Sequence, residues 1–166
     1  MKRRHLLTTG TAALALAGCA TKSKFQRYNG PEVTYVIVNK GAREMFLLHN
    51  QKILKQYRID LGFAPIGDKF YEGDGKTPEG TYLIDRRNPN SKFHLSLGIS
   101  YPNAHDIAQA RALGKPPGGD IFIHGESKPW KLGKNDWTWG CIAVPNEEME
   151  KIYAMVKNGT PIRINA

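Results

Sequence analysis

Most of the chain beyond residue 31 consists of short apolar runs separated by polar turns. Short runs of this kind, bounded by turn-forming side chains, are typical of β-strands. Two of them alternate between apolar and polar side chains, which predicts strands with one buried face: residues 57–63 and 95–101. The other runs predict further short strands at 33–38, 44–48, 53–54, 81–84, 121–123, 142–144 and 162–164.

Two segments show helical spacing instead. The first covers residues 106–113 and is followed by Gly114, a residue that is common just beyond helix C-termini. The second begins with Asn146 as its N-cap, has two glutamates in its first turn and stops at Gly159. Many short strands with two helices predict a mainly β fold, either a β-sandwich or a closed barrel.

The candidate chemistry lies at the ends of two of these short strands. His124 is near the end of the run 120–125, and Cys141 directly precedes the run 142–144. A thiol becomes a strong nucleophile where a base, a cation or backbone donors favour the thiolate. We therefore expect Cys141 to be a nucleophile paired with His124 as general base and acid. A buried structural cysteine beside a structural histidine is the alternative.

Glycines flank both candidate residues. Gly140 allows an unusual backbone conformation before the cysteine, where consecutive N–H groups can hold an oxyanion, and Gly125 frees the strand end to turn. The polar segment 126–137 between them carries Trp130 and Trp137. These tryptophans either wall a substrate cleft or pack in the core.

The first eighteen residues have the features of an export signal. A basic head at residues 2–4 precedes an apolar run at 6–17 that is too short to span a bilayer comfortably. Arg3 and Arg4 also resemble a twin-arginine signal, so export by the general or the twin-arginine route is open.

The sequence Leu-Ala-Gly-Cys ending at Cys19 resembles the lipobox of bacterial lipoproteins, in which the cysteine carries lipid and becomes the mature N-terminus. It predicts a lipoprotein signal peptide at 1–18, a lipidated Cys19 and tether at 19–30, and one folded domain at 31–166. The expected location is a bacterial membrane, facing the periplasm or cell wall. Cleavage near Ala17 by an ordinary signal peptidase is the alternative.

The net charge and the cysteine content limit which binding partners and which cysteine chemistry the sequence predicts. The formal net charge is +9, and removing the three basic residues of the head leaves +6. An exported lipoprotein does not ordinarily meet nucleic acid, so anionic wall polymers or lipid head groups are the expected partners. With Cys19 lipidated, Cys141 has no disulfide partner. A zinc site of His124, Cys141 and either His94 or His105 is a rival, but the sequence lacks closely paired ligands.

Three segments resemble the L,D-transpeptidase catalytic domain family (YkuD-type). Residues 75–82 are similar to its Gly-x-Thr-Pro-x-Gly-x-Tyr/Phe element, residues 101–125 to its approach to the catalytic histidine, and residues 138–141 to its Ser/Thr-x-Gly-Cys motif. The helix near the C-terminus and residues 159–162 resemble the family's usual ending. The resemblance covers nearly the whole predicted domain.

This resemblance implies acyl transfer on peptidoglycan stem peptides through a thioester. Cys141 would attack the amide on the L-centre of diaminopimelate, His124 would protonate the departing amine, and the Gly140 N–H would stabilise the oxyanion. No cofactor or metal is implied. The residues expected to contact substrate are Tyr101, Gly125, Thr138 and Trp139.

Two positions depart from the family's commonest form, which has His before the Gly-Cys pair and Arg two residues after the cysteine. Here these positions are Trp139 and Ala143. A Cys-Ile-Ala-Val sequence resembles a variant branch in which some members hydrolyse the same linkage. Three outcomes therefore stay open: a transpeptidase, an L,D-carboxypeptidase or amidase, and a non-catalytic wall-binding lipoprotein. The sequence does not define the acceptor, the membrane leaflet, protein partners or the oligomeric state.

Overall fold

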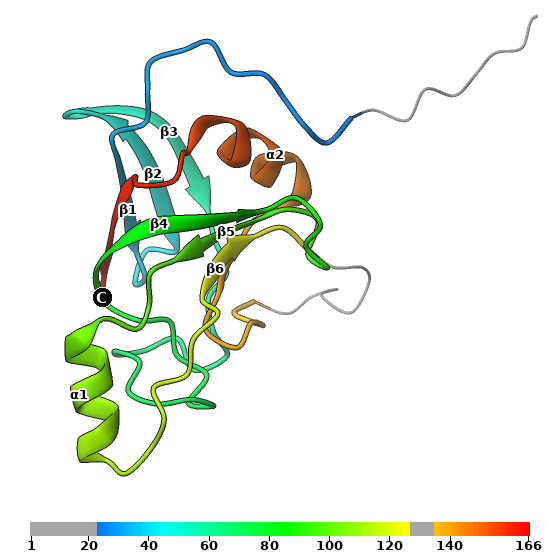
Figure 1. Ribbon diagram of the computed structural model, residues 1–166. Helices are drawn as coiled ribbons and strands as arrows, with labels where there is room; N and C mark the ends of the chain where they lie inside the picture. The colour runs from blue at the N-terminus through cyan, green and yellow to red at the C-terminus, as the bar shows by residue number, and fades with distance from the viewer. Residues whose placement is uncertain (1–22, 127–134) are drawn as a thin grey trace, which may run out of the picture.

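The computed structural model describes residues 23–126 and 135–166. These ranges contain eight strands and two helices: β1 (Tyr35–Asn39), β2 (Glu44–His49), β3 (Lys52–Arg58), β4 (Gly80–Asn88), β5 (Ser96–Ile99), α1 (Ala104–Ala112), β6 (Phe122–His124), β7 (Ile142–Ala143), α2 (Asn146–Met155) and β8 (Pro161–Asn165). All eight strands form one sheet in the order β3-β2-β1-β8-β4-β5-β6-β7. The predicted mainly β fold with two helices is confirmed, and the sheet curls into a half-barrel (Figure 1).

The first and last strands of this sheet meet at a short seam. After β3 ends, Asp60 pairs with Ala143 in β7, and the two residues exchange backbone hydrogen bonds of 2.9 and 2.8 Å. Gly62 forms a second, isolated bridge with Thr138. Because β7 directly follows Cys141, the seam joins the segment after β3 to the segment that carries the candidate nucleophile.

The two alternating segments meet the prediction to different extents. Tyr57, Ile59 and Leu61 are buried while Arg58 and Phe63 are exposed, so the predicted alternation in residues 57–63 is confirmed. In residues 57–63 the regular strand stops at Arg58, because the chain leaves β2 there and crosses to the seam. In residues 95–101 all four residues of β5 are buried, so this strand does not have one solvent-facing side. β5 lies between β4 and β6, and the Arg86 side chain lies so close to Gly98 that it covers that position.

Both predicted helices exist with shifted ends. α1 starts earlier because Asn103 caps it: the Asn103 side chain accepts the N–H of Asp106, and the Asp106 side chain accepts the N–H of Asn103. Asn146 is the first residue of α2 and not its N-cap, since Pro145 takes that position. The Asn146 side chain instead accepts the N–H of Glu126 at 2.7 Å. α2 ends at Met155, because Val156 is already extended.

The hydrophobic core fills the concave side of the curled sheet, and α2 covers it (Figure 1). α2 buries Met149, Ile152 and Tyr153 there, and burying one such side chain contributes roughly 2 kcal/mol. α1 lies apart from this core, at the far end of the molecule from the N-terminal segment (Figure 1). In the described ranges neither helix has the length and apolarity to cross a bilayer. The expected signal peptide and Cys19 lie outside these ranges.

Candidate active site

Parallel pairing of β6 with β7 brings the predicted histidine and cysteine together. His124 is the register partner of Ala143, and Cys141 lies two residues before Ala143. Residues two apart on an extended chain face the same side, so Cys141 and His124 are neighbours on one face of the sheet. Both line a single cleft of about 480 Å³.

The Cys141 thiol is held in a state that favours the proton. Burial is the largest effect and raises the pKa of this thiol to about 11. A backbone hydrogen bond from Phe122 and the charges of Lys69 and Arg86 oppose this rise, while Asp120 adds to it. The Cys141 S–H donates to the carbonyl oxygen of Asp120 at 3.5 Å. The raised pKa favours the thiol form of Cys141 in the resting protein.

The His124 ring is held in one orientation by its neighbours. Only 3% of this residue is exposed, and its Nδ1 lies 2.6 Å from the carbonyl oxygen of Gly125. A carbonyl can only accept a hydrogen bond, so Nδ1 carries the proton and the basic lone pair belongs to Nε2. The rings of Phe93 and Trp137 pack against the imidazole with centroid distances of 4.4 and 5.7 Å, which limits the ring's rotation.

The turn before Cys141 is tied together by Thr138. The Thr138 hydroxyl donates to the carbonyl oxygen of Cys141 at 2.7 Å and accepts the N–H of Gly140 at 3.2 Å. Gly140 has a φ of +118°, which other residues rarely adopt. The N–H of Gly140, predicted to face an oxyanion, is thus bonded to Thr138. The N–H of Cys141 donates to no described residue and is the better placed donor.

Three glycines allow close backbone contact behind the nucleophile. A Cβ on Gly62 would lie 2.0 Å from the carbonyl oxygen of Gly75 and 3.0 Å from the Cα of Gly140. A Cβ on Gly140 would lie 2.6 Å from the carbonyl oxygen of Lys76. The Gly-x-Thr-Pro element therefore packs directly against the Gly-Cys turn. Gly75 belongs to a motif that is visible in the sequence, whereas no sequence motif marks Gly62.

A buried ion pair organises the loop that leads into this element. Lys69 and Asp74 are both buried, with Nζ and Oδ1 2.8 Å apart. The Asp74 carboxylate also accepts the N–H groups of Phe70, Tyr71 and Lys76. Sequence reasoning missed this pair, because a lysine and an aspartate in a polar loop normally lie in solvent.

The predicted substrate-contacting residues fall in different places. Tyr101 is buried outside the cleft, and its hydroxyl donates to the carbonyl oxygen of Pro117 at 2.9 Å. Gly125 packs closely against Asn146: a Cβ added to Gly125 would lie 2.5 Å from Asn146 Oδ1. Trp139 is 70% exposed, and its ring meets Phe63 edge-on at 5.0 Å. Trp139 is thus beside the nucleophile and open to a ligand. Trp130 lies outside the described residues.

Further residues line the cleft that no sequence motif marks. They come from the loop between β4 and β5 and from the start of β6: Asn88, Asn90, Ser91, Lys92, Phe93, Ser96, Asp120 and Phe122. The guanidinium of Arg86 stacks on the Phe122 ring at 4.4 Å and approaches Asp120 at 3.3 Å. Lys92 and Arg86 therefore supply positive charge at the cleft and beside it. A polar loop of this kind carries no sequence signal of its own beyond its composition.

The zinc alternative gains no support from the placement of the other histidines. His94 Nε2 pairs with Glu150 at 3.0 Å, and His105 contacts Gln109 on α1. Within residues 23–126 and 135–166, no three side chains of the types His, Cys, Asp and Glu gather as a metal site.

Comparison with known proteins places this geometry in context. The family described as "L,D-transpeptidase catalytic domain" (YkuD) matches residues 33–164. The chain is 31% identical over 128 residues to the Escherichia coli K12 protein named "Putative L,D-transpeptidase YafK", covering 74% of this chain and 46% of that protein. It is 30% identical to "Putative L,D-transpeptidase YkuD" of Bacillus subtilis, covering 79% and 65%. The chain thus spans about half the length of the first relative.

Solved structures give the same picture. The helical cell shape determining protein Pgp2 from Campylobacter jejuni superimposes with a TM-score of 0.61 and 29% identity, covering 82% of this chain and 49% of that one. An L,D-transpeptidase from Mycobacterium smegmatis superimposes with a TM-score of 0.54 and 16% identity, covering 81% and 59%. The second likeness concerns the fold alone.

Proposed function

Because the chain belongs to the L,D-transpeptidase catalytic domain family, we propose that it transfers an acyl group from a peptidoglycan stem peptide through Cys141. The observation that carries this proposal is the shared cleft, in which Cys141 and His124 lie on one face of two paired strands. The Nδ1–H contact with Gly125 supports it further, because it leaves Nε2 basic.

The first half of the reaction forms a thioester. As the stem peptide binds, His124 Nε2 takes the proton of Cys141, and the sulfur attacks the carbonyl carbon of the amide on the L-centre of diaminopimelate. The Cys141 N–H stabilises the resulting oxyanion, with the Gly140 N–H joining if Thr138 releases it. The carbon–nitrogen bond breaks, and the imidazolium returns its proton to the departing amine.

The second half depends on the incoming nucleophile. An amine of a second stem peptide gives a crosslink, a D-amino acid gives exchange, and water gives a shortened peptide. In each case His124 takes the nucleophile's proton and the thiol is regenerated. Lys92, which lines the cleft, is the cation placed to hold a stem-peptide carboxylate, whereas the nearby Arg86 already pairs with Asp85 at 2.8 Å and Asp120 at 3.3 Å.

Hydrolysis of the same linkage, by an L,D-carboxypeptidase or amidase, is a second candidate with an observation in its favour. Ala143 is buried between Asp60 and His124 in the strand pairings, so no cation projects from the position two residues after the cysteine. An acceptor peptide loses one charged contact there, while water needs none. We propose that this chain belongs to the variant branch with the sequence Cys-Ile-Ala-Val, in which alanine replaces the arginine found two residues after the cysteine.

The experiment that separates these outcomes uses the chain from Ala20 onward with diaminopimelate-containing tetrapeptides and their crosslinked or protein-linked forms. Products are read by mass spectrometry. We expect Cys141→Ala and His124→Ala each to abolish turnover, while Gly119→Ala retains it, because a Cβ on Gly119 meets nothing within 4 Å. Crosslinks or exchange identify a transpeptidase, shortened peptides alone identify a hydrolase, and the absence of any Cys141-dependent product leaves a non-catalytic wall-binding protein.

We also propose that the protein is exported and anchored by lipid at Cys19. The support is the sequence around Cys19 together with a family that acts on the cell wall. Labelled palmitate should enter the full chain and fail to enter the Cys19→Ala variant. Equal labelling of both would remove the anchor from the proposal.

A further inference from the structure

A basic pocket that shares no lining residue with the candidate active-site cleft lies between the N-terminal segment, β3 and α2. It has a volume of about 300 Å³ and is lined by Gln26, Arg27, Tyr28, Lys55, Lys151, Ala154 and Met155. Three of these residues are cationic and none is acidic. Like charges that converge on one hollow repel one another, so an anion bound there is stabilised by all three.

The three cations are not neutralised by the protein. Among the residues that the structure describes, Arg27, Lys55 and Lys151 form no ion pair or side-chain hydrogen bond. Glu150, which precedes Lys151 on α2, already accepts from Gln26 at 2.9 Å and faces His94 at 3.0 Å. All three cationic side chains are exposed. They are therefore available to a ligand from outside.

Exposed apolar side chains flank this pocket. Phe25 precedes Gln26 in the N-terminal segment, and Ile53 lies two residues before Lys55 on β3; each is 54% exposed. Lys24 Nζ lies 5.5 Å above the Phe25 ring. Basic side chains interleaved with an aromatic and an aliphatic residue are the composition of a surface that enters the head-group region of a membrane.

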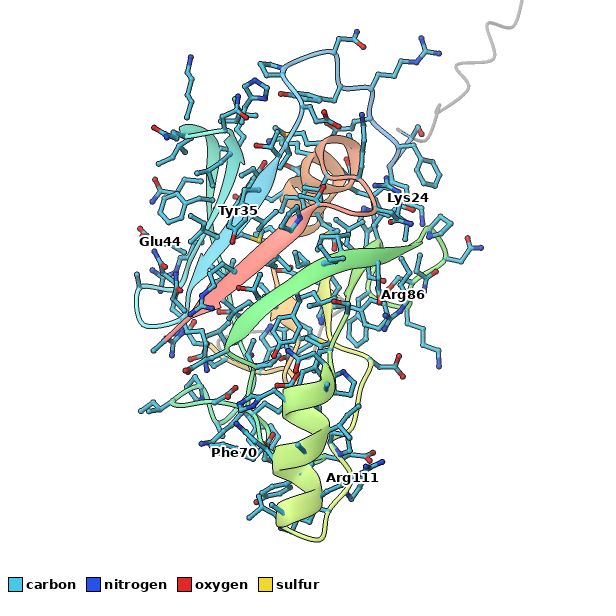
Figure 2. All side chains as sticks on the ribbon, turned by 60° about the vertical axis from the view of Figure 1, so that its left-hand side comes forward. Lys24, Tyr35, Glu44, Phe70, Arg86 and Arg111 are labelled. Atoms are coloured by element: carbon cyan, nitrogen blue, oxygen red, sulfur yellow. The ribbon has the colours of Figure 1, made fainter. Side chains whose placement is uncertain are left out.

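The position of the pocket fits a membrane-facing end. The N-terminal segment runs over α2 and the β2–β3 end before it leaves the described part of the chain, while α1 lies at the opposite end (Figure 1). Figure 2 shows Lys24 and Arg111 at these two ends. The segment that lines the pocket is also the route by which the chain continues toward its N-terminus.

We infer that this face, made by Phe25, Arg27, Ile53, Lys55 and Lys151, docks on an anionic phospholipid surface. The pocket takes the phosphate of a head group, and the two apolar side chains enter the interface beside it. A soluble anionic wall polymer offers charge but no apolar phase, so it leaves Phe25 and Ile53 without a role. The inference depends neither on catalysis nor on lipid at Cys19.

The test uses an unlipidated chain that begins at Ala20. It keeps the hydrophobic core that the structure describes, because those core residues and the apolar residues packed on them lie between residues 28 and 164. Sedimentation with phosphatidylglycerol vesicles at low salt should remove the protein from solution, while phosphatidylcholine vesicles should not. We expect the Lys55→Glu/Lys151→Glu variant to bind at least about 25-fold more weakly, at roughly fivefold for each basic residue.

A matched variant changes the same charge elsewhere. Arg111→Glu/Lys115→Glu lowers the net charge equally on and beside α1, and it should bind vesicles like the unmodified chain. Phe25→Ala/Ile53→Ala should weaken vesicle binding at least fivefold while leaving binding of soluble polyphosphate unchanged. Thermal unfolding and Cys141-dependent turnover check that each variant is folded.

Three results would overturn the inference. The unmodified chain could fail to bind phosphatidylglycerol vesicles, or the two double charge variants could lose binding equally, which reduces the effect to net charge. Polyphosphate could also bind as tightly as vesicles, with vesicle binding insensitive to Phe25→Ala/Ile53→Ala. That last result would identify the face as a site for a soluble polyanion.

Discussion

The environment of Cys141 sets the pH at which its thiol reacts. Because burial raises the pKa of this thiol to about 11, the thiolate fraction in the free protein keeps increasing with pH well beyond the range in which an ordinary cysteine is already ionised. We expect the rate of alkylation by iodoacetamide to be low at pH 7 and to rise continuously up to at least pH 10. Mass spectrometry of Cys141 at each pH measures this rate.

The same measurement distinguishes a resting thiol from a thiolate–imidazolium pair. A pair would give a rate that is already on a plateau near neutral pH and that falls in the His124→Ala variant. Such a plateau would contradict the protonated resting state described above and would identify a thiolate–imidazolium pair. Free cysteine in the same buffers is the reference.

Gly62 offers a test of the backbone contacts behind the nucleophile. In Gly62→Ala the new Cβ would lie 2.0 Å from the Gly75 carbonyl oxygen, a backbone atom that cannot move alone. We expect this variant to lose at least about 2 kcal/mol of unfolding free energy and to lose turnover, because Gly140 lies on the same contact. Urea denaturation measures the first effect and muropeptide assays the second. Gly119→Ala should change stability by less than about 0.5 kcal/mol; similar losses in both variants would argue against a steric cause.

At the scale of elements, the loop from residue 67 to 79 depends on a buried ion pair. Burial alone would raise the pKa of Asp74, but the Lys69 ammonium and three backbone N–H groups outweigh it, and the pKa is lowered. Asp74→Asn leaves the buried Lys69 charge without its partner, and we expect a loss of about 3–5 kcal/mol in urea denaturation. Lys69→Met/Asp74→Asn should recover part of this loss, because no unpaired charge remains.

The sign of the pH effect follows from the direction of the shift. A carboxylate with a lowered folded-state pKa stabilises the fold above its unfolded value near 3.8, and this contribution disappears as the pH falls through the lower folded value. The unmodified chain should therefore lose more stability than the Asp74→Asn variant between pH 5 and 2. Parallel stability curves for the two proteins would contradict this role of Asp74.

Local sequence patterns predicted most of the strands and helices, because the formation of these elements depends largely on residues close together in the chain. The hairpin of β2 and β3 and the two helices follow from short-range periodicity and turn residues. The prediction of one exposed face for β5 failed because Arg86 on the neighbouring strand β4 covers Gly98, and the pattern of β5 itself does not contain that side chain. In α2, Asn146 is not the N-cap because Pro145 takes that position, and its side chain bonds to Glu126 across the fold.

Site residues with distinctive chemistry could be predicted from the sequence. Residues whose place in the cleft depends on how side chains pack could not. Cys141 and His124 were identified from residue type and position, and the structure brings them to one cleft. Their catalytic roles stay predictions. Tyr101 was expected at the substrate, yet it lies in the core. No property of a single residue states whether a tyrosine packs inward or lines a cleft, because both positions bury an aromatic ring.

Taken as a whole, the molecule is a curled sheet whose two edges are joined near the nucleophile. Asp136 links the parts: its carboxylate accepts hydrogen bonds from Nε and Nη2 of Arg43, on the turn between β1 and β2, and one from the N–H of Leu61 in the seam. Thr138, two residues further on, pairs with Gly62. The Arg43–Asp136 contact lies outside the cleft and therefore holds the turn before Cys141 in place from there.

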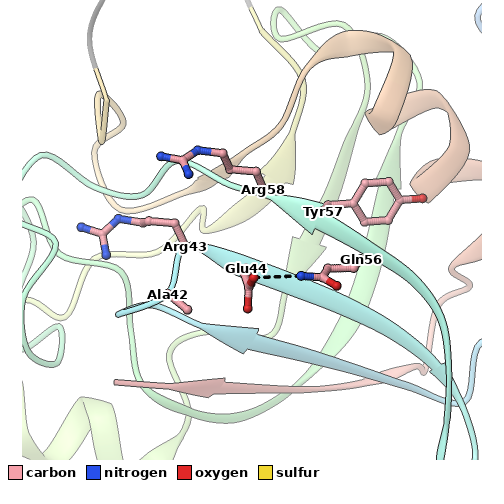
Figure 3. Close-up of a pocket in the computed structure, with 6 residues that line it drawn as sticks. All are labelled: Ala42, Arg43, Glu44, Gln56, Tyr57 and Arg58. Atoms are coloured by element: carbon pink, nitrogen blue, oxygen red, sulfur yellow. Dashed lines mark hydrogen bonds between the residues drawn. The ribbon is translucent and has the colours of Figure 1, made fainter.

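Arg43 and Arg58 form a matched pair for testing this link. Both line one surface pocket at the ends of β2 and β3, and their guanidinium groups point to the same side (Figure 3). Arg43 binds Asp136, whereas Arg58 makes no side-chain hydrogen bond or ion pair with the residues the structure describes. Arg43→Met should lower turnover at least fivefold and speed amide exchange at Leu61 and Thr138, since charged hydrogen bonds of this kind are worth about 1.5–3 kcal/mol.

Arg58→Met removes the same charge and the same kind of side chain, so it should keep both properties of the unmodified chain. Hydrogen exchange read by mass spectrometry and the muropeptide assay measure the two effects independently. If Arg43→Met speeds exchange and leaves turnover intact, the seam is a stabilising feature without influence on the nucleophile. If both variants lose turnover alike, the effect belongs to surface charge, because a lost positive charge is what they share.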